Sequence, residues 1–193
     1  EYLSGNVRQK LRTAQRVAVR DPFFAGNVDA LIAAQPKDLE ASEIEVRLGA
    51  TWLDKKYIEQ FMYETFETPR YLRGQIEISY VPYTAEWQVS RKSMVRYNDV
   101  AAFTTYGTDR ASAYRLLEDA LNLRDIRIYD TIEDADGRER RVLNAKETTL
   151  AAQKQQLIRD AFKDWIWKDP ERRETLVRQY NEEMNLSLIH ISE

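Results

Sequence analysis

Carboxylates and arginines are the side chains of this sequence whose spacing suggests chemistry. The 193 residues include no cysteine and a single histidine, His190. A serine–histidine triad, a cysteine–histidine pair and an ordinary zinc site therefore cannot be built from residues 1–185. The six glycines lie far apart and none precedes a lysine. The sequence thus lacks a phosphate-cradling loop of the Walker or dinucleotide type.

Two groups of carboxylates have spacings that merit a functional interpretation. Asp160 and Asp164 lie one helical turn apart and could share a proton or a metal. Arg159 and Lys163 interleave with them, however, which is typical of a solvated charged face. The acidic stretch 133–136 lacks the first carboxylate of an EF-hand loop, so a hairpin turn explains it better. We therefore predict no catalytic, metal-binding or cofactor-binding residue in this chain.

Five basic residues with no acid among them mark the first predicted helix, and four of them are arginines at every fourth position: Arg8, Lys10, Arg12, Arg16 and Arg20. An opposing apolar stripe would let this helix lie on a core and offer its arginines to a nucleic-acid backbone. Such binding would weaken steeply with salt. The alternative is a solvated face that pairs with acids elsewhere. Aromatic residues, which would favour single-strand binding, are missing from this helix.

The stretch DWIWKDPERRETL, residues 164–176, places two tryptophans before an Asp-Pro helix start. Trp165 continues the apolar stripe of its predicted helix, whereas Trp167 lies about 200° around the helix, beside the acidic side. Asp169 and Pro170 suit the N-cap and the first position of a following helix. We expect a C-terminal helical hairpin with Trp167 at its corner. The alternative is an exposed aromatic anchor for a partner protein.

Apolar periodicity and capping residues predict helices interspersed with short strands. Asp21 and Pro22, for example, suit the N-cap and the first position of a helix. Helices are expected at 4–20, 22–35, 42–48, 54–67, 109–122, 145–168 and 170–184, the third of them because Ser42 and Glu45 have capping-box spacing. Strands are expected at 75–81, 86–90, 99–104, 125–132 and 138–143, the last two joined by a hairpin turn at 134–137.

This pattern indicates an α+β fold with a small antiparallel sheet of about four to five strands and packed helices. Residues 1–68 are expected to form a helical N-terminal part that begins with the basic helix. Residues 69–185 are expected to form an α+β part that ends in two helices. The alternative is one continuous core without a seam at residue 68.

Composition and charge narrow the class of protein. A net charge of −3 argues against a mainly basic nucleic-acid wrapper. The lack of cysteine excludes a disulfide scaffold. No apolar run approaches the roughly 20 residues that span a bilayer, and the first residues lack the apolar core of a signal peptide. We expect a cytoplasmic protein without a membrane partner.

Both ends of the sequence look like truncation points. The chain opens on Glu1 rather than methionine, and the stretch LSLIHISE, residues 186–193, changes abruptly from a charged helix to an apolar string. That stretch looks like the in-frame translation of a transposase adapter used to build sequencing libraries, so we expect it to be foreign. The alternative is a genuine short β-tail. We expect residues 1–185 to be a truncated fragment of a longer protein.

Several stretches together resemble one family. They are EYLSGNVRQKL, QPKDLEASEIEVRLGATWL, IEQFMYETFETPRY, TTYGTDRASAYRLLEDALNLRDIRIYD and RVLNAKETTLAAQKQQLIRDAFKDWIWKDPERRETLVRQYNEEMN. They are similar to the region that precedes the helicase core in large Swi/Snf-type helicases, often fused to an adenine-specific DNA methylase, of phages, plasmids and conjugative elements. The family's ATP-binding lysine, acidic magnesium-binding box and methylase Asn-Pro-Pro motif have no counterpart here, so no catalytic residue carries over.

The resemblance implies a role in a DNA-processing protein, without showing that this segment contacts DNA. Together with the arginines of the first helix, it leads to the hypothesis of a non-catalytic accessory module that joins a methylase to an ATPase motor and contributes contacts to the DNA backbone. ATP with magnesium and S-adenosylmethionine are then expected only in the parent protein. The partners implied are the flanking methylase and ATPase domains and DNA. One alternative is a purely structural docking domain without DNA affinity. Another alternative is a carboxylate-dependent nuclease that uses Asp160 or Asp164.

Overall fold

The computed structural model describes residue 3 and residues 5–186, and the chain forms two compact units. The central unit comprises Val46–Lys168, and the terminal unit combines the chain up to Glu45 with the chain from Asp169 onward. The seam expected near residue 68 lies inside the central unit. Of the stretch 186–193, only Leu186 belongs to the described residues, so the expectation of a foreign tail lies almost wholly outside them.

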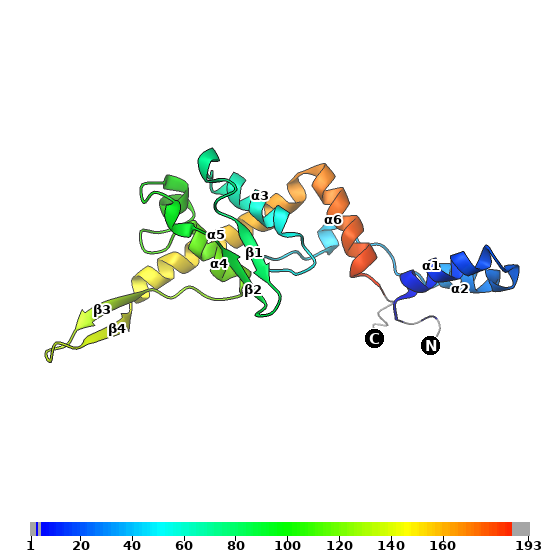
Figure 1. The fold of residues 1–193 in the computed structure, drawn as a ribbon, viewed down its shortest axis with the longest axis horizontal. Coiled ribbons are helices and arrows are strands. Elements are labelled where there is room, and N and C mark those ends of the chain that lie inside the picture. The colour runs from blue at the N-terminus through cyan, green and yellow to red at the C-terminus, as the bar shows by residue number, and fades with distance from the viewer. Residues whose placement is uncertain (1–2, 4, 187–193) are drawn as a thin grey trace. The chain divides into compact units, whose positions relative to one another are not determined.

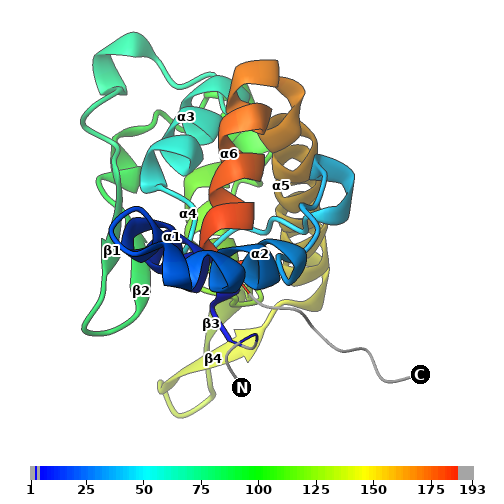
Figure 2. The same cartoon turned by 90° about the vertical axis from the view of Figure 1, so that its right-hand side faces the viewer.

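Two helices, α1 (Val7–Ala18) and α2 (Ala25–Ala33), lie side by side in the terminal unit, as Figures 1 and 2 show. Asn6 begins α1, because its side chain accepts a hydrogen bond from the backbone N–H of Gln9. Asp21 caps the short turn Pro22–Phe24 that leads into α2, which confirms this predicted start. The pair shares a small core of Val7, Leu11, Ala14, Val28 and Leu31.

The terminal unit also contains α6 (Pro170–Glu183), which begins as predicted with Asp169 as its N-cap and Pro170 at its first position. Asn181 ties this helix to the segment that follows α2. Its side chain accepts from the backbone N–H of Leu39 at 2.8 Å and donates to the carbonyl of Leu39 at 2.9 Å. Asn181 is buried, so pairing both ends of its amide avoids the cost of an unsatisfied polar group.

Three helices build the core of the central unit: α3 (Lys55–Thr65), α4 (Ala113–Leu121) and α5 (Ala145–Lys168). Both α3 and α4 pack on α5. The rings of Phe61 and Phe162 meet edge to face at 5.2 Å, and those of Phe66 and Tyr114 do the same. All four side chains are fully buried. No helix in the described part of the chain has both the length and the apolar composition to cross a bilayer.

The first two strands, β1 (Ile78–Val81) and β2 (Glu86–Val89), form an antiparallel pair whose edges are covered by helix side chains. On β1, the N–H of Ile78 donates to the Glu59 carboxylate of α3 at 2.9 Å. On β2, the N–H of Val89 donates to the Glu118 carboxylate of α4 at 2.8 Å. Asn122 exchanges two further hydrogen bonds with the backbone of Trp87. These contacts satisfy edge groups that a third strand would otherwise bind.

The second pair, β3 (Tyr129–Glu133) and β4 (Glu139–Leu143), is a separate hairpin that projects from the rest of the central unit (Figure 1). Every residue of it except Asp130 is exposed. Arg110 fastens its base, with 2.7 Å to the Asp130 carboxylate and 2.8 Å to the carbonyl of Tyr129. The hydrogen bonds from Arg110 and Asn144 hold the pKa of Asp130 below its usual value.

The α+β class is confirmed, but the single sheet of four to five strands is wrong. The structure has two separate two-stranded sheets among the described residues. The predicted strand at 99–104 is instead a π-helical turn, Ala101–Thr105. Asp99 starts this turn, because its side chain accepts from the N–H of Ala102 at 2.9 Å. Ala101 and Ala102 are buried and lack the β-branching that favours a strand.

The predicted helix at 42–48 is also wrong. Only a short 3-10 turn, Ala41–Glu43, forms there, and its capping box uses Glu40 and Glu43 rather than Ser42 and Glu45. The chain then runs extended, and Ile44, Val46 and Leu48 are buried while the residues between them are exposed. This period of two is the pattern of a strand-like segment, and it outweighs the capping signal.

Candidate nucleic-acid interface

The basic residues predicted on the first helix lie on α1 and in the turn after it. Arg12, Arg16 and Arg20 are exposed, and within the described residues none of the three makes an ion pair. A helix rises about 1.5 Å per residue, so side chains four positions apart begin about 6 Å apart along its axis. Arg12 and Arg16 are thus neighbours along α1, and Arg20 adds a third exposed guanidinium group in the turn after the helix. We call these three residues the arginine row.

Arg8 differs from the other arginines because it serves the fold of the terminal unit. Its Nη2 lies 2.6 Å from the Asp38 carboxylate, and its Nε donates to the carbonyl of Asn185 at 2.8 Å. Only 17% of its side chain is exposed. The sequence did not reveal this partner, because Asp38 lies 30 positions later and no local pattern links the two. Arg8 is therefore poorly placed to bind a ligand.

A polar depression adjoins the arginine row within the terminal unit. Its volume is about 340 Å³, and its lining includes Arg8, Arg12, Arg16 and one carboxylate, Glu182. Arginine can donate two parallel hydrogen bonds to a phosphate, which makes such a depression suited to anions. Glu182 opposes this, so the more open arginines, Arg12 and Arg16, carry the attraction.

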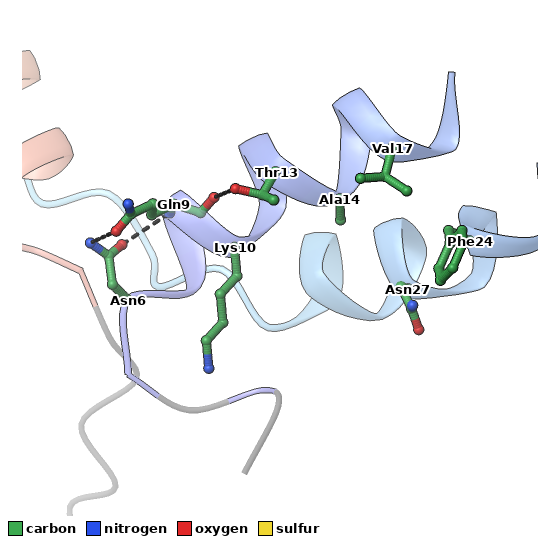
Figure 3. A pocket seen from close by; sticks show the side chains of 8 residues that line it. All are labelled: Asn6, Gln9, Lys10, Thr13, Ala14, Val17, Phe24 and Asn27. Carbon is green, nitrogen blue, oxygen red and sulfur yellow. Dashed lines mark hydrogen bonds between the residues drawn. The ribbon is translucent and has the colours of Figure 1, made fainter. Parts of the chain in front are cut away.

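An apolar groove of about 430 Å³ lies between α1 and α2 and adjoins the polar depression, because Gln9 and Thr13 line both. Figure 3 shows Ala14 and Val17 of α1 and Phe24 from the turn before α2 along this groove, with Lys10 at its rim. Lys10 is half-buried, so it belongs to this surface rather than to the arginine row. The terminal unit thus presents one charged surface and one apolar surface.

The two tryptophans of the DWIW stretch lie near the end of α5. The Nε1 of Trp165 donates to the Glu64 carboxylate at 2.7 Å, and its ring meets that of Phe61 at 5.7 Å. Trp165 therefore links α5 to α3 inside the central unit, and its role there is structural. Trp167 is half-buried on the same helix.

The paired carboxylates of α5 remain on its surface. Asp160 and Asp164 are exposed, and Asp160 accepts a hydrogen bond from Gln156 at 2.9 Å. Across the described residues, no three or more acidic or histidine side chains converge as a metal site requires.

Burial raises the pKa of two buried or half-buried groups of the central unit, Tyr114 and Asp119. It raises the pKa of the Tyr114 phenol to about 12, although the hydrogen bond with Thr68 acts in the opposite direction. The two hydroxyl oxygens lie 2.6 Å apart. Burial also raises the pKa of Asp119, against the attraction of Arg124. Each group has a protein partner that suits a structural role.

Comparison with known proteins identifies a family through a match to the central region of the chain. No curated protein and no solved structure matches it. Residues 47–186 match the model of a family described as a domain of unknown function, DUF8437. The match covers the central unit from Arg47 onward and includes α6, whereas α1 and α2 lie outside it. Because it spans more than half of the sequence, the chain belongs to the DUF8437 family.

Proposed function

We propose that this chain is a non-catalytic module of a larger DNA-processing protein, in which α1 contacts the phosphate backbone of duplex DNA. The observation that carries the proposal is the exposed row of Arg12, Arg16 and Arg20, which makes no ion pair among the described residues. The resemblance to segments beside helicase and methylase domains supplies the setting. In that setting, ATP and S-adenosylmethionine bind to the neighbouring domains, and this module connects them.

The number of phosphates that the three arginines neutralise determines how steeply DNA affinity should fall with salt. A protein that neutralises three phosphates has a slope of about −2.7 in a plot of log affinity against log salt. Affinity should then fall about 40-fold between 50 and 200 mM salt. The backbone contacts carry no base recognition, so affinity should not depend on sequence.

The test measures binding of a fluorescently labelled duplex to the full chain by anisotropy over that salt range. A variant with Arg12, Arg16 and Arg20 changed to alanine should bind far more weakly and lose most of the salt slope. A matched control changes three exposed arginines elsewhere, Arg47, Arg127 and Arg138, which lowers the net charge equally. Equal affinities of the two variants would refute the role of α1.

Protein docking is the second candidate, and the apolar surface of the helix pair favours it. Besides the groove of Figure 3, Val19 and Phe23 are each 87% exposed. Exposed apolar side chains that gather in this way mark interaction sites. This alternative predicts no duplex binding, but a stable complex with the neighbouring ATPase region that Phe23→Asp disrupts. Co-elution of the two proteins in gel filtration would distinguish it from DNA binding.

A further inference from the structure

The central unit exposes two Arg-Tyr pairs that its fold does not use. Tyr71 is 61% exposed and follows Arg70, and Tyr97 is 88% exposed and follows Arg96. Both arginines are exposed and make no ion pair among the described residues. A tyrosine ring buries a large area when it is covered, so rings left this open are available for a ligand.

Both pairs lie on segments that leave the same end of the β1–β2 hairpin. Ser90, which follows β2, donates from its N–H to the carbonyl of Glu77 at 2.9 Å and from its hydroxyl to that of Gln75 at 3.2 Å. Gln75 in turn donates from its side chain to the carbonyl of Tyr71 at 2.7 Å. The segment that enters β1 and the segment that leaves β2 are thus joined at this end, where Figure 1 shows the two strands side by side.

Buried neighbours hold the backbone on each side of this surface. Leu72, next to Tyr71, is buried in the turn Arg70–Leu72, and Val95, next to Arg96, is buried as well. The backbone N–H of Asp99 donates to the carbonyl of Arg96 at 3.0 Å, which closes the turn that carries Tyr97. The rings and guanidinium groups therefore project from supported segments.

Three arginines at this end are open to an anionic ligand. Arg91, directly after Ser90, is a third exposed arginine without an ion pair among the described residues. Two other cations nearby serve the fold: Lys92 pairs with Glu118 at 2.6 Å, and Arg73 donates to the carbonyl of Thr68 at 2.9 Å. Three carboxylates lie in the same segments: Glu67 and Glu77 are exposed, and Asp99 accepts from the N–H of Ala102 at 2.9 Å.

We propose that this end of the hairpin binds single-stranded DNA, with Tyr71 and Tyr97 stacked on bases and Arg70, Arg91 and Arg96 against phosphates. Duplex DNA presents its phosphates but keeps its bases stacked inside, so exposed rings gain contact only with unstacked bases. The surface lies on the central unit and shares no residue with the α1 contact. It goes beyond the proposed function, because it adds a second nucleic-acid form at a second site.

The test uses the full chain and a labelled poly-dT oligonucleotide in anisotropy titrations. Replacing an aromatic stack by alanine should weaken binding by about 5- to 150-fold per base. We therefore expect a large loss for the Tyr71→Ala, Tyr97→Ala double variant and near-normal binding for the double phenylalanine variant, which keeps both rings. Tyr83→Ala is the matched control, since Tyr83 is 98% exposed in the turn between β1 and β2, at the other end of the hairpin. It should bind as the unaltered chain does.

Two charge variants complete the design. Changing Arg70, Arg91 and Arg96 to alanine should weaken binding and reduce its salt slope by about 2, at roughly 0.7 per phosphate. Glu77→Gln, which removes one of the opposing carboxylates, should strengthen binding. Because these side chains are exposed, the urea midpoint of each variant should match that of the unaltered chain, which separates loss of binding from loss of folding.

Several results would overturn the proposal. They are undetectable poly-dT binding, equal losses for the Tyr71 and Tyr97 double variant and for Tyr83→Ala, and tighter binding of a poly-U strand of equal length. The α1 variants keep the two proposals apart. If Arg12, Arg16 and Arg20 prove irrelevant to duplex binding while the tyrosine variants still lose poly-dT, only the duplex proposal fails. Poly-dT binding that depends on the α1 arginines and not on the tyrosines would refute the second site alone.

Discussion

Gly49→Ala should destabilise the central unit strongly, because two separate costs meet at this residue. Gly49 has φ +87°, a left-handed conformation that costs an alanine roughly 1–2 kcal/mol. A Cβ there would lie 2.3 Å from the carbonyl oxygen of Leu121. Leu121 is the last residue of α4 and is buried, so its backbone cannot move without shifting that helix. Overpacking of this kind adds about 1–3 kcal/mol, and we expect a total near 3–4 kcal/mol.

Gly74→Ala provides the matched control. Its φ is +82°, nearly that of Gly49, but a Cβ there would meet nothing within 4 Å. Only the conformational cost of roughly 1–2 kcal/mol should remain. The difference between the two variants therefore measures the contact with Leu121, free of the backbone effect.

Urea unfolding followed by tryptophan fluorescence is the assay, because all four tryptophans lie in the central unit. With a slope of about 1.5 kcal/mol per molar urea, Gly49→Ala should lower the midpoint by about 2 M and Gly74→Ala by about 1 M. Equal midpoints for the two variants would show that Gly49 does not approach α4 as closely as the structure has it.

Three further predictions concern charged and buried groups. Burial keeps the Tyr114 phenol protonated, and its contribution to the free energy of unfolding is fully present below pH 10.0. About 3 kcal/mol of this free energy should be lost as pH rises toward about 12. Urea midpoints measured across that range should fall less steeply for Tyr114→Phe. Arg8→Ala should lower the free energy of unfolding of the terminal unit by about 1–2 kcal/mol, whereas Arg12→Ala should change it by less than about 0.5 kcal/mol. Thermal unfolding followed by the helical circular dichroism signal would measure both changes. The pKa of Asp130 is held low by Arg110, so its contribution is present above pH 3.8 and is lost as pH falls through the lowered pKa. Hydrogen exchange at the base of the β3–β4 hairpin should lose this acid sensitivity in Asp130→Asn.

Local signals in the sequence predicted most of the helices correctly. The Asp-Pro starts at 21–22 and 169–170 fix the beginnings of the turn before α2 and of α6, because a capping carboxylate and a proline act within one turn. The long apolar stripe over 145–168 coincides with α5 at both ends. These features are set by residues close together in the chain, so they can be predicted from a single sequence.

Features that depend on distant partners were not predictable in the same way. Whether β1 and β2 join a larger sheet depends on Glu59 and Glu118, which reach their edges from helices 19 and 29 positions away. A carboxylate that accepts from an edge N–H leaves no hydrogen-bonding pattern in the strand itself. Likewise, the arginine spacing of α1 gave no indication that Arg8 would be neutralised by Asp38.

The Arg-Tyr surface could have been noticed in the sequence, because the dipeptide recurs at 70–71 and 96–97. What the sequence lacks is the information that the segments carrying the two copies meet at one end of the same hairpin. That placement requires the pairing of Ile78 with Val89 and the contacts of Ser90 with the segment before β1. A pair of dipeptides 26 positions apart becomes a candidate surface only through this register.

The extent of the family match bears on which proposal applies more widely. It begins at residue 47, so it contains all five residues of the single-strand surface and none of the arginines of α1. A property of the family has to arise from the matched region, whereas duplex contact through α1 requires the helix pair that precedes it. We therefore expect other members of the family to bind poly-dT whether or not a basic helix precedes their matched region. A member that presents the equivalent rings and arginines, yet binds no single strand, would contradict this reasoning even if α1 proves to contact duplex DNA here.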